Sequence, residues 1–398
     1  MMSLRDSSRT LPDALGRRSM KRAAACVLLA SATALLGGCG LFGSKPAHVP
    51  TPLTTFQQSL NVQQVWTASV GKAGSYYFEP LVVGDSVYAA GVNGKIIRVD
   101  AASGKVTWTA KAGTDISAGP GSDGEITAVG TLKGEVLAFD HTGKEIWKGN
   151  AGSEVLTAPL VGHGLVIARA INNRITAFDA QTGAVRWIFQ QPNVPLTLRT
   201  GSSMIFVGDH AMVTGFPGGQ LASLDINNGS VLWGATLSLP QGVTEVERIN
   251  DVTGTPTLFG RQICAVTFQG RIGCVDAITG NGLWARAFSS SAGLSQDGQI
   301  VASTNTQSQV FALDSSNGDT LWHNDKLMWR GLSAPLILGP TVVVGDDEGY
   351  LHFLSRDKGD FIARVKTDSS GIRAQPVLVG DTLVVQTRDG ELFAYRPK

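Results

Sequence analysis

The chain has 398 residues, of which 43% are hydrophobic, 16% are charged and 48 are glycine. This length and apolar content allow a large buried core, and the many glycines favour a chain rich in tight turns. The formal net charge is +1, but the first 38 residues hold six basic and two acidic side chains, so the remainder carries about −3. That balance excludes the basic surface typical of nucleic-acid-binding proteins.

The first predicted element is a secretion signal at residues 1–38. Two basic residues precede an apolar run at 23–36, which is too short to span a membrane as a helix. The run ends in Leu36-Gly37-Gly38-Cys39, which resembles the bacterial lipobox, whose cysteine becomes the lipidated first residue of the mature protein. We therefore expect a lipid anchor at Cys39; the alternative is a plain signal peptide with an incidental cysteine.

Residues 39–55 are predicted to form a flexible tether. This segment is rich in glycine, serine, lysine and proline and has no apolar periodicity. Gly40 stands where an aspartate commonly favours inner-membrane retention of Gram-negative lipoproteins. We therefore expect a protein anchored in the outer membrane and facing the periplasm. Translation could start at Met1 or at Met20, since the shorter leader is also complete.

Residues 56–398 repeat one pattern about every forty residues. Each copy reads turn glycine, short apolar strand, aspartate, glycine-containing turn, and tryptophan at the end of the next strand. Six copies are complete, with Asp100-Gly104-Trp108, Asp140-Gly143-Trp147, Asp179-Gly183-Trp187, Asp225-Gly229-Trp233, Asp276-Gly280-Trp284 and Asp314-Gly318-Trp322. Such a period predicts a β-propeller in which each repeat is a four-stranded antiparallel blade. We expect each tryptophan to pack between blades, with its indole N–H bonded to a carbonyl.

The repeats predict an all-β, eight-bladed propeller. A seventh repeat, at residues 340–365, has Ser355 and Ala363 in place of the aspartate and tryptophan. The eighth reaches the C-terminus after only three strands, and residues 62–68 match the missing outer strand. An N-terminal strand that completes the last blade would close the ring and cover an open edge. Seven tryptophans then occupy the repeat position, namely Trp66, Trp108, Trp147, Trp187, Trp233, Trp284 and Trp322.

Two insertions interrupt the regular spacing. Successive repeat tryptophans are about 40 residues apart, except for 46 between Trp187 and Trp233 and 51 between Trp233 and Trp284. The insertions, at residues 190–199 and 239–251, each join an outer strand to the inner strand of the next blade, so both should reach the same face. Long loops with leucine, arginine and acidic residues are typical of protein interfaces.

The cysteines of the mature part are Cys264 and Cys274, which flank a turn at Gln269-Gly270. An oxidising compartment would allow them to form a disulfide. A three-residue turn with a glycine bulge would place them opposite each other, whereas a two-residue turn would place them on opposite faces of the sheet. The sequence leaves both arrangements open.

Motifs for catalysis or metal binding are missing from the sequence. The histidines lack zinc-site spacing, and there is no adjacent cysteine pair, haem-attachment motif or Gly-x-Ser-x-Gly motif. Asp346-Asp347-Glu348-Gly349 is acidic but lacks the alternating spacing of a calcium loop, so it favours a hairpin turn. We therefore expect no enzymatic activity, no metal and no cofactor.

The repeat at residues 174–187 resembles that of pyrroloquinoline-quinone-type propellers. With the lipobox, the eight repeats and the two insertions, the chain over residues 56–398 resembles the BamB family of lipoproteins, which belong to the machinery that assembles outer-membrane β-barrels. The resemblance implies a scaffold that docks on the periplasmic (POTRA) repeats of BamA, contacts unfolded outer-membrane clients and aids the folding and insertion of barrel proteins.

In that family the contact uses a Leu-x-Leu-Arg loop and a second loop of the form Arg-x-x-Asp-Val-Asp. The matching residues are Leu196, Leu198 and Arg199 in the first loop and Arg248 and Asp251 in the second, while Thr253 stands in place of the last aspartate. The resemblance implies that the leucines fill an apolar hollow on the partner. Arg199 would either bond across the interface or pair with Asp251.

Two alternatives to this reading remain. One is a relative of the quinone-dependent dehydrogenases, which are longer and typically have an adjacent cysteine pair, a calcium site and an acidic base in the central funnel. The other is a periplasmic propeller that serves a different partner, such as a polysaccharide or a signalling protein.

Overall fold

The computed structural model describes residues 48–199 and 202–398. The predicted signal at 1–38, the lipidation site Cys39 and the tether before residue 48 lie outside the described residues. Residues 50–398 form one structural unit. In the described part of the chain, no helix is long and apolar enough to cross a membrane.

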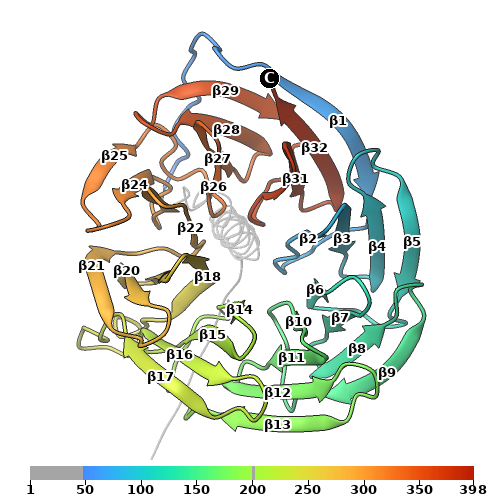
Figure 1. Ribbon diagram of the computed structural model, residues 1–398. Helices are drawn as coiled ribbons and strands as arrows, with labels where there is room; N and C mark the ends of the chain where they lie inside the picture. The colour runs from blue at the N-terminus through green and yellow to red at the C-terminus, as the bar shows by residue number, and fades with distance from the viewer. Residues whose placement is uncertain (1–47, 200–201) are drawn as a thin grey trace, which may run out of the picture. The chain divides into compact units, whose positions relative to one another are not determined.

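Eight four-stranded antiparallel sheets surround a central axis in residues 50–398 (Figure 1). From the inner to the outer strand, blades one to four consist of β2 (Leu81–Val83), β3 (Ser86–Ala90), β4 (Lys95–Asp100) and β5 (Val106–Lys111); β6 (Ala118–Ser122), β7 (Thr127–Gly130), β8 (Glu135–Phe139) and β9 (Glu145–Asn150); β10 (Leu160–Gly162), β11 (Leu165–Arg169), β12 (Arg174–Asp179) and β13 (Val185–Gln190); and β14 (Met204–Val207), β15 (Ala211–Phe216), β16 (Gln220–Asp225) and β17 (Val231–Thr236).

Blades five to eight consist of β18 (Val252–Phe259), β19 (Gln262–Thr267), β20 (Gly270–Asp276) and β21 (Gly282–Phe288); β22 (Leu294–Gln296), β23 (Ile300–Thr304), β24 (Val310–Asp314) and β25 (Thr320–Asn324); β26 (Leu336–Leu338), β27 (Thr341–Gly345), β28 (Tyr350–Ser355) and β29 (Phe361–Lys366); and β30 (Val377–Val379), β31 (Thr382–Gln386), β32 (Glu391–Pro397) and β1 (Val62–Ser69). The predicted eight-bladed propeller is confirmed.

The ring closes where the two ends of the unit meet. Strand β1 pairs with β32 in antiparallel register, from Val62 opposite Pro397 to Ser69 opposite Glu391. Figure 1 shows β1 in blue beside β32 in red. The predicted closure by an N-terminal strand is therefore confirmed, and the outer side of β32 is paired with β1 rather than left as an open edge.

A tryptophan joins most blades to the next one. Trp66 is 7% exposed, and its Nε1–H donates to the carbonyl oxygen of Ala101, 2.8 Å away in the Asp–Gly turn of blade one. Its indole covers Gly104, where an added Cβ would lie 2.6 Å from the ring. Equivalent bonds run from Trp147 to Ala180, Trp187 to Ile226, Trp233 to Ala277, Trp284 to Ser315 and Trp322 to Arg356.

Trp108 departs from this pattern. Its ring covers Gly143, but its buried indole N–H has no acceptor among the described residues. The turn that it covers, from Asp140 to Gly143, is one residue shorter than the other Asp–Gly turns. The carbonyl that follows the aspartate is therefore not positioned to accept the bond, although the contact of the ring with glycine is kept.

Blade seven has the buried Ala363 where other blades have tryptophan. The next blade has no Asp–Gly turn for a tryptophan to cover, because β32 and β1 come from the two ends of the unit and no turn joins them. The hydrophobic cluster around Ala363 instead includes Tyr395 and is covered by Leu60 and Val62. The substitution thus follows from the way the ring closes.

Cys264 and Cys274 lie directly opposite each other on β19 and β20 and form a disulfide. Their register is centred on Gln269, which has a positive φ of 51°. This is the odd-membered turn, one of the two arrangements that the sequence left open. Both cysteines are fully buried, so the disulfide is structural.

Candidate docking site

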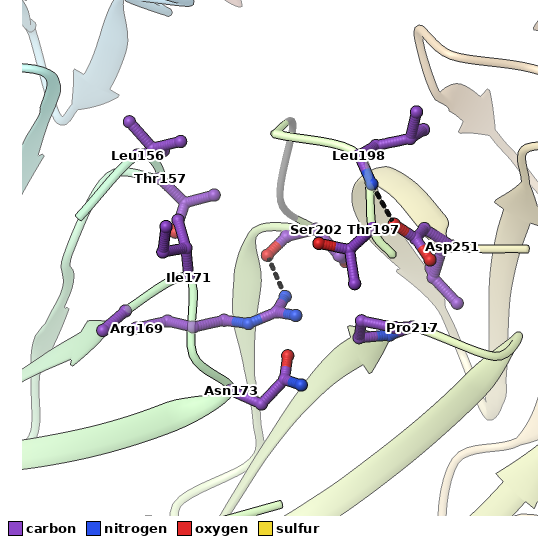
Figure 2. Close-up of a pocket in the computed structure, with 12 residues that line it drawn as sticks. Leu156, Thr157, Arg169, Ile171, Asn173, Thr197, Leu198, Ser202, Pro217 and Asp251 are labelled. Carbon is purple, nitrogen blue, oxygen red and sulfur yellow. Dashed lines mark hydrogen bonds between the residues drawn. The ribbon is translucent and has the colours of Figure 1, made fainter. Parts of the chain in front are cut away.

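The two insertions meet on one face of the propeller, as their positions between blades predicted. Residues 191–199 follow β13, and residues 237–251 follow β17. The backbone N–H of Leu198 donates to the Oδ2 atom of Asp251, 2.6 Å away (Figure 2). This bond joins residues 53 positions apart and holds the first loop against the second.

The leucines of the first loop differ in exposure. Leu196 is 42% exposed, whereas Leu198 is partly buried. Leu198 and Thr197 line a small pocket whose floor includes Arg169 and Pro217 (Figure 2). Leu196 is therefore the more accessible apolar group of the Leu-x-Leu-Arg segment, and Leu198 links that segment to the propeller.

Asp251 lies beneath the first loop rather than on the surface. It is 4% exposed, and burial raises the pKa of its carboxyl group, although the N–H of Leu198 and the charge of Arg169 oppose the shift. In the structure Asp251 therefore holds the loop that carries Leu198, through its hydrogen bond to the Leu198 N–H.

Arg169 is a second buried charge under the same loop, and sequence reasoning missed it. One of its guanidinium nitrogens donates to the carbonyl oxygen of Ser202 at 2.7 Å, and the guanidinium lies 4.9 Å from the ring centre of Phe216. Burial lowers its pKa to about 10, while the negative charge of Asp251 acts in the opposite direction. The available signal was an arginine at the end of an otherwise apolar strand, β11.

Arg199 pairs with a residue that the sequence did not indicate. Its guanidinium donates to the carboxylate of Glu154, in the loop between β9 and β10, and not to Asp251. The Arg199 side chain is 67% exposed and that of Glu154 is 31% exposed. Because this ion pair is largely solvated, it is weak and can exchange partners at little cost.

The second loop contributes exposed apolar side chains as well as Arg248, which is exposed. Leu239 is 69% exposed, Val243 is 96% exposed and Val246 is 61% exposed. Thr253, in place of the expected aspartate, is buried in β18 and donates its hydroxyl to the carbonyl oxygen of Ser290 at 2.8 Å. The departure at this position therefore removes no charge from the surface.

A central cavity of about 450 Å³ opens among the loops that join the outer strand of one blade to the inner strand of the next. Its lining includes Arg199, Arg373, Tyr77 and Glu79, and burial raises the pKa of Glu79.

The acidic turn at residues 346–349 does not form a calcium loop. The carboxylate of Asp346 is hydrogen-bonded to the side chains of Arg330 and His352. The described residues contain no group of three or more side chains suited to hold a metal ion.

Comparison with known proteins adds the family. A sequence profile described as outer membrane protein assembly factor BamB matches residues 92–324. The chain is 51% identical to the outer membrane protein assembly factor BamB of Burkholderia pseudomallei, over 95% of this chain and 99% of the relative.

The chain belongs to the BamB family.

A second relative agrees with this assignment, and solved structures share the fold. The BamB of Bordetella pertussis is 39% identical, over 91% of this chain and 94% of its own length. The crystal structure of BamB from Moraxella catarrhalis covers 84% of this chain with a TM-score of 0.77 and 24% identity. The quinohemoprotein alcohol dehydrogenase of Comamonas testosteroni covers 84% of this chain and 76% of its own chain with a TM-score of 0.64 but only 14% identity, so it shares the fold alone with this chain.

Proposed function

We propose that this protein is a lipid-anchored, non-enzymatic scaffold of the machinery that assembles outer-membrane proteins. It docks on the periplasmic POTRA repeats of BamA, contacts unfolded clients and aids the folding and insertion of β-barrel proteins. The observation that carries the proposal is the junction of the two elaborated loops through Leu198 and Asp251, in a chain whose relatives are named as assembly factors.

The docking surface consists of the exposed groups around that junction. Leu196 is an apolar anchor suited to an apolar hollow on the partner, and fully desolvated anchors of this kind carry most of the binding energy at protein interfaces. Arg199 can exchange Glu154 for an acidic group of the partner. Arg248 lies at the exposed rim of the second loop, and Asp251 acts from below by holding Leu198.

The proposed location is the outer membrane, on its periplasmic side. It rests on the lipobox-like sequence at Cys39 and on the outer-membrane machinery named in the relatives. The absence of catalysis is part of the same proposal: the resemblance to the quinone-dependent enzymes is confined to the fold.

The test is co-purification of the lipidated protein from outer membranes in detergent. The wild type should bring down BamA, whereas Leu196→Ala/Leu198→Ala/Arg199→Ala, with an unchanged unfolding transition, should bring down at least tenfold less, a loss of about 1.4 kcal/mol or more. The matched control is Lys105→Ala/Lys144→Ala, in exposed Asp–Gly turns on the opposite face. Equal recovery from the triple variant would reject the loop assignment, and no recovery from the wild type would reject the partner.

A further inference from the structure

Residues 51–60, which we call the strap, run along the outside of the propeller before β1 begins. The N–H of Thr51 donates to the carbonyl oxygen of Met328 at 2.9 Å, and the N–H groups of Ser59 and Leu60 donate to that of Ile362 at 2.9 and 3.2 Å. The first half of the strap was predicted to be part of a flexible tether. In the structure it lies against blades six and seven.

We call the loops at residues 191–199 and 237–251 the docking loops, and the face that carries them the docking face. The strap starts on this face. Met328 lies between the outer strand β25 and the inner strand β26, and the docking loops occupy the same kind of connection. Ile362 lies at the start of β29, next to the turn that joins β28 to β29. This turn corresponds to the Asp–Gly turns of the other blades and lies on the opposite face. The chain therefore enters the propeller on the docking face and crosses the edge of blade seven to reach β1.

Two arginines of the propeller bind backbone carbonyls of the strap. Arg330 donates to the carbonyl oxygen of Thr51 at 3.1 Å, and Arg364 donates to that of Thr54 at 2.9 Å. The Arg330 side chain is only 3% exposed and is fixed by Asp346, whose Oδ2 accepts from its Nε at 2.8 Å. Such charge-assisted bonds to fixed guanidinium groups are stronger than bonds between neutral groups.

A buried network holds the second arginine in place. The Nε–H of Arg364 donates to Nδ1 of His352 at 3.0 Å, so the histidine carries its proton on Nε2 and donates it to Asp346, 2.9 Å away. His352 and Asp346 are both fully buried. The strap is thus bonded to a preorganised part of the core rather than to mobile surface side chains.

Apolar contacts complete the attachment. The ring of Phe56 stacks on that of Phe361 with centroids 5.4 Å apart, and Arg364 lies 5.0 Å from the Phe56 ring centre. Leu53 packs against the cluster that contains Trp322. Leu53 and Phe56 belong to the strap and not to the core of a blade, so they can be changed without disrupting the packing within a blade.

We infer that the strap sets how far the docking face can move from the membrane; the inference rests on the proposed lipid anchor. Twelve residues separate Cys39 from Thr51, a reach of at most about 40 Å, whereas 23 residues separate Cys39 from Val62, a reach of about 80 Å. The strap therefore halves the maximum distance between Cys39 and the first fixed residue of the propeller. It also means that the chain towards Cys39 leaves the propeller from the docking face and not from the opposite face. A shorter tether raises the effective concentration of the docking loops near a membrane-bound partner.

The experiment measures energy transfer from a fluorophore on the full lipidated protein to acceptor-labelled headgroups in vesicles of phosphatidylethanolamine and phosphatidylglycerol. One sample carries the donor at Val243→Cys in the docking loop, and another carries it at Lys105→Cys on the opposite face. The wild-type strap should give higher transfer from position 243 than from position 105. Equal transfer from vesicle-bound protein would overturn the inference about the strap. Failure to bind vesicles would instead reject the lipid anchor.

Release of the strap should lower the transfer from position 243, because the maximum reach of the chain from Cys39 rises from about 40 Å to about 80 Å. The releasing variant is Leu53→Ser/Phe56→Ala, and faster amide exchange at Ser59 and Leu60 verifies the release. The matched control is Thr55→Ala/Gln57→Ala, at exposed positions of the same strap. An insertion of eleven Gly/Ser residues after Gly43, with the strap intact, should lower the transfer to the same extent. Unchanged transfer after verified release, or with the insertion, would overturn the inference.

Discussion

Trp66 donates its indole N–H to the carbonyl oxygen of Ala101, 2.8 Å away, and thereby joins the last blade to the first. The two residues are only 35 positions apart in the chain, yet the bond closes the ring of eight blades. The same bond at five further interfaces makes each blade dependent on its neighbour. Trp108 lacks it, which provides an internal comparison.

The value of this bond can be measured with Trp147→Phe and Trp108→Phe. Both changes remove similar ring volume, but only Trp147→Phe leaves a buried carbonyl, that of Ala180, without its donor. An unsatisfied buried acceptor costs about 1–3 kcal/mol. We therefore expect Trp147→Phe to lower the free energy of unfolding in urea by about 1–3 kcal/mol more than Trp108→Phe. Equal losses would show that the indole bonds add nothing to packing.

The glycine beneath each tryptophan should be irreplaceable for a steric reason. Gly104 has a φ of +72°, and an added Cβ would lie 2.6 Å from the Trp66 ring. Gly84 has a φ of +55° with no atom within 4 Å of an added Cβ. Both alanine variants incur backbone strain, but Gly104→Ala adds a clash that costs about 1–3 kcal/mol. Thermal unfolding should show a clearly larger loss for Gly104→Ala, and similar losses would refute the role of the ring contact.

The hydrogen bond from the Leu198 N–H to Asp251 predicts that loss of this carboxylate affects both partner binding and the mobility of the loop. Asp251→Ala removes the acceptor of the Leu198 N–H and leaves the buried charge of Arg169 uncompensated. We expect BamA recovery to fall together with faster amide exchange at Leu198. Leu196→Ala should also reduce recovery but leave that exchange rate unchanged. If Asp251→Ala weakened binding with normal exchange at Leu198, the carboxylate would have to contact the partner directly.

Stability should fall in mild acid through His352. Burial lowers its pKa in the folded protein, so below a pH of about 6.5 the unfolded chain binds a proton that the folded protein does not. Its contribution is therefore complete above that pH and is lost as the pH falls towards the folded pKa, by at most about 1.4 kcal/mol per pH unit. The contribution of Asp346, whose pKa is lowered in the folded state, is lost only below its ordinary value of 3.8.

His352→Gln, which keeps a donor for Asp346, separates this effect from the rest of the network. The variant should show a shallower decline in unfolding free energy between pH 7 and pH 5 than the wild type. All other residues are the same in the two proteins, so the difference between their slopes reports His352 alone. Identical slopes would mean that the pKa of His352 is the same in the folded and the unfolded protein.

The sequence by itself determined the architecture, because each blade is encoded locally. Strand, Asp–Gly turn and tryptophan recur within about forty residues, so their order predicts the blade count, the closing strand and the shared face of the two insertions. The sequence also shows that the seventh repeat has Ala363 in place of tryptophan. The reason for this difference is visible only in the structure, where β1 and β32 meet without a turn between them.

Only the tertiary structure decided which side chains meet across blades. Arg199 pairs with Glu154, 45 positions away, and Arg330 binds the carbonyl of Thr51, 279 positions away. Such contacts depend on the closed ring, and a bond to a backbone carbonyl leaves no trace in the identity of the residue that accepts it. For this reason residues 51–55, the first half of the strap, were predicted to be part of a tether, and Asp251, which is buried, was predicted to be a partner contact.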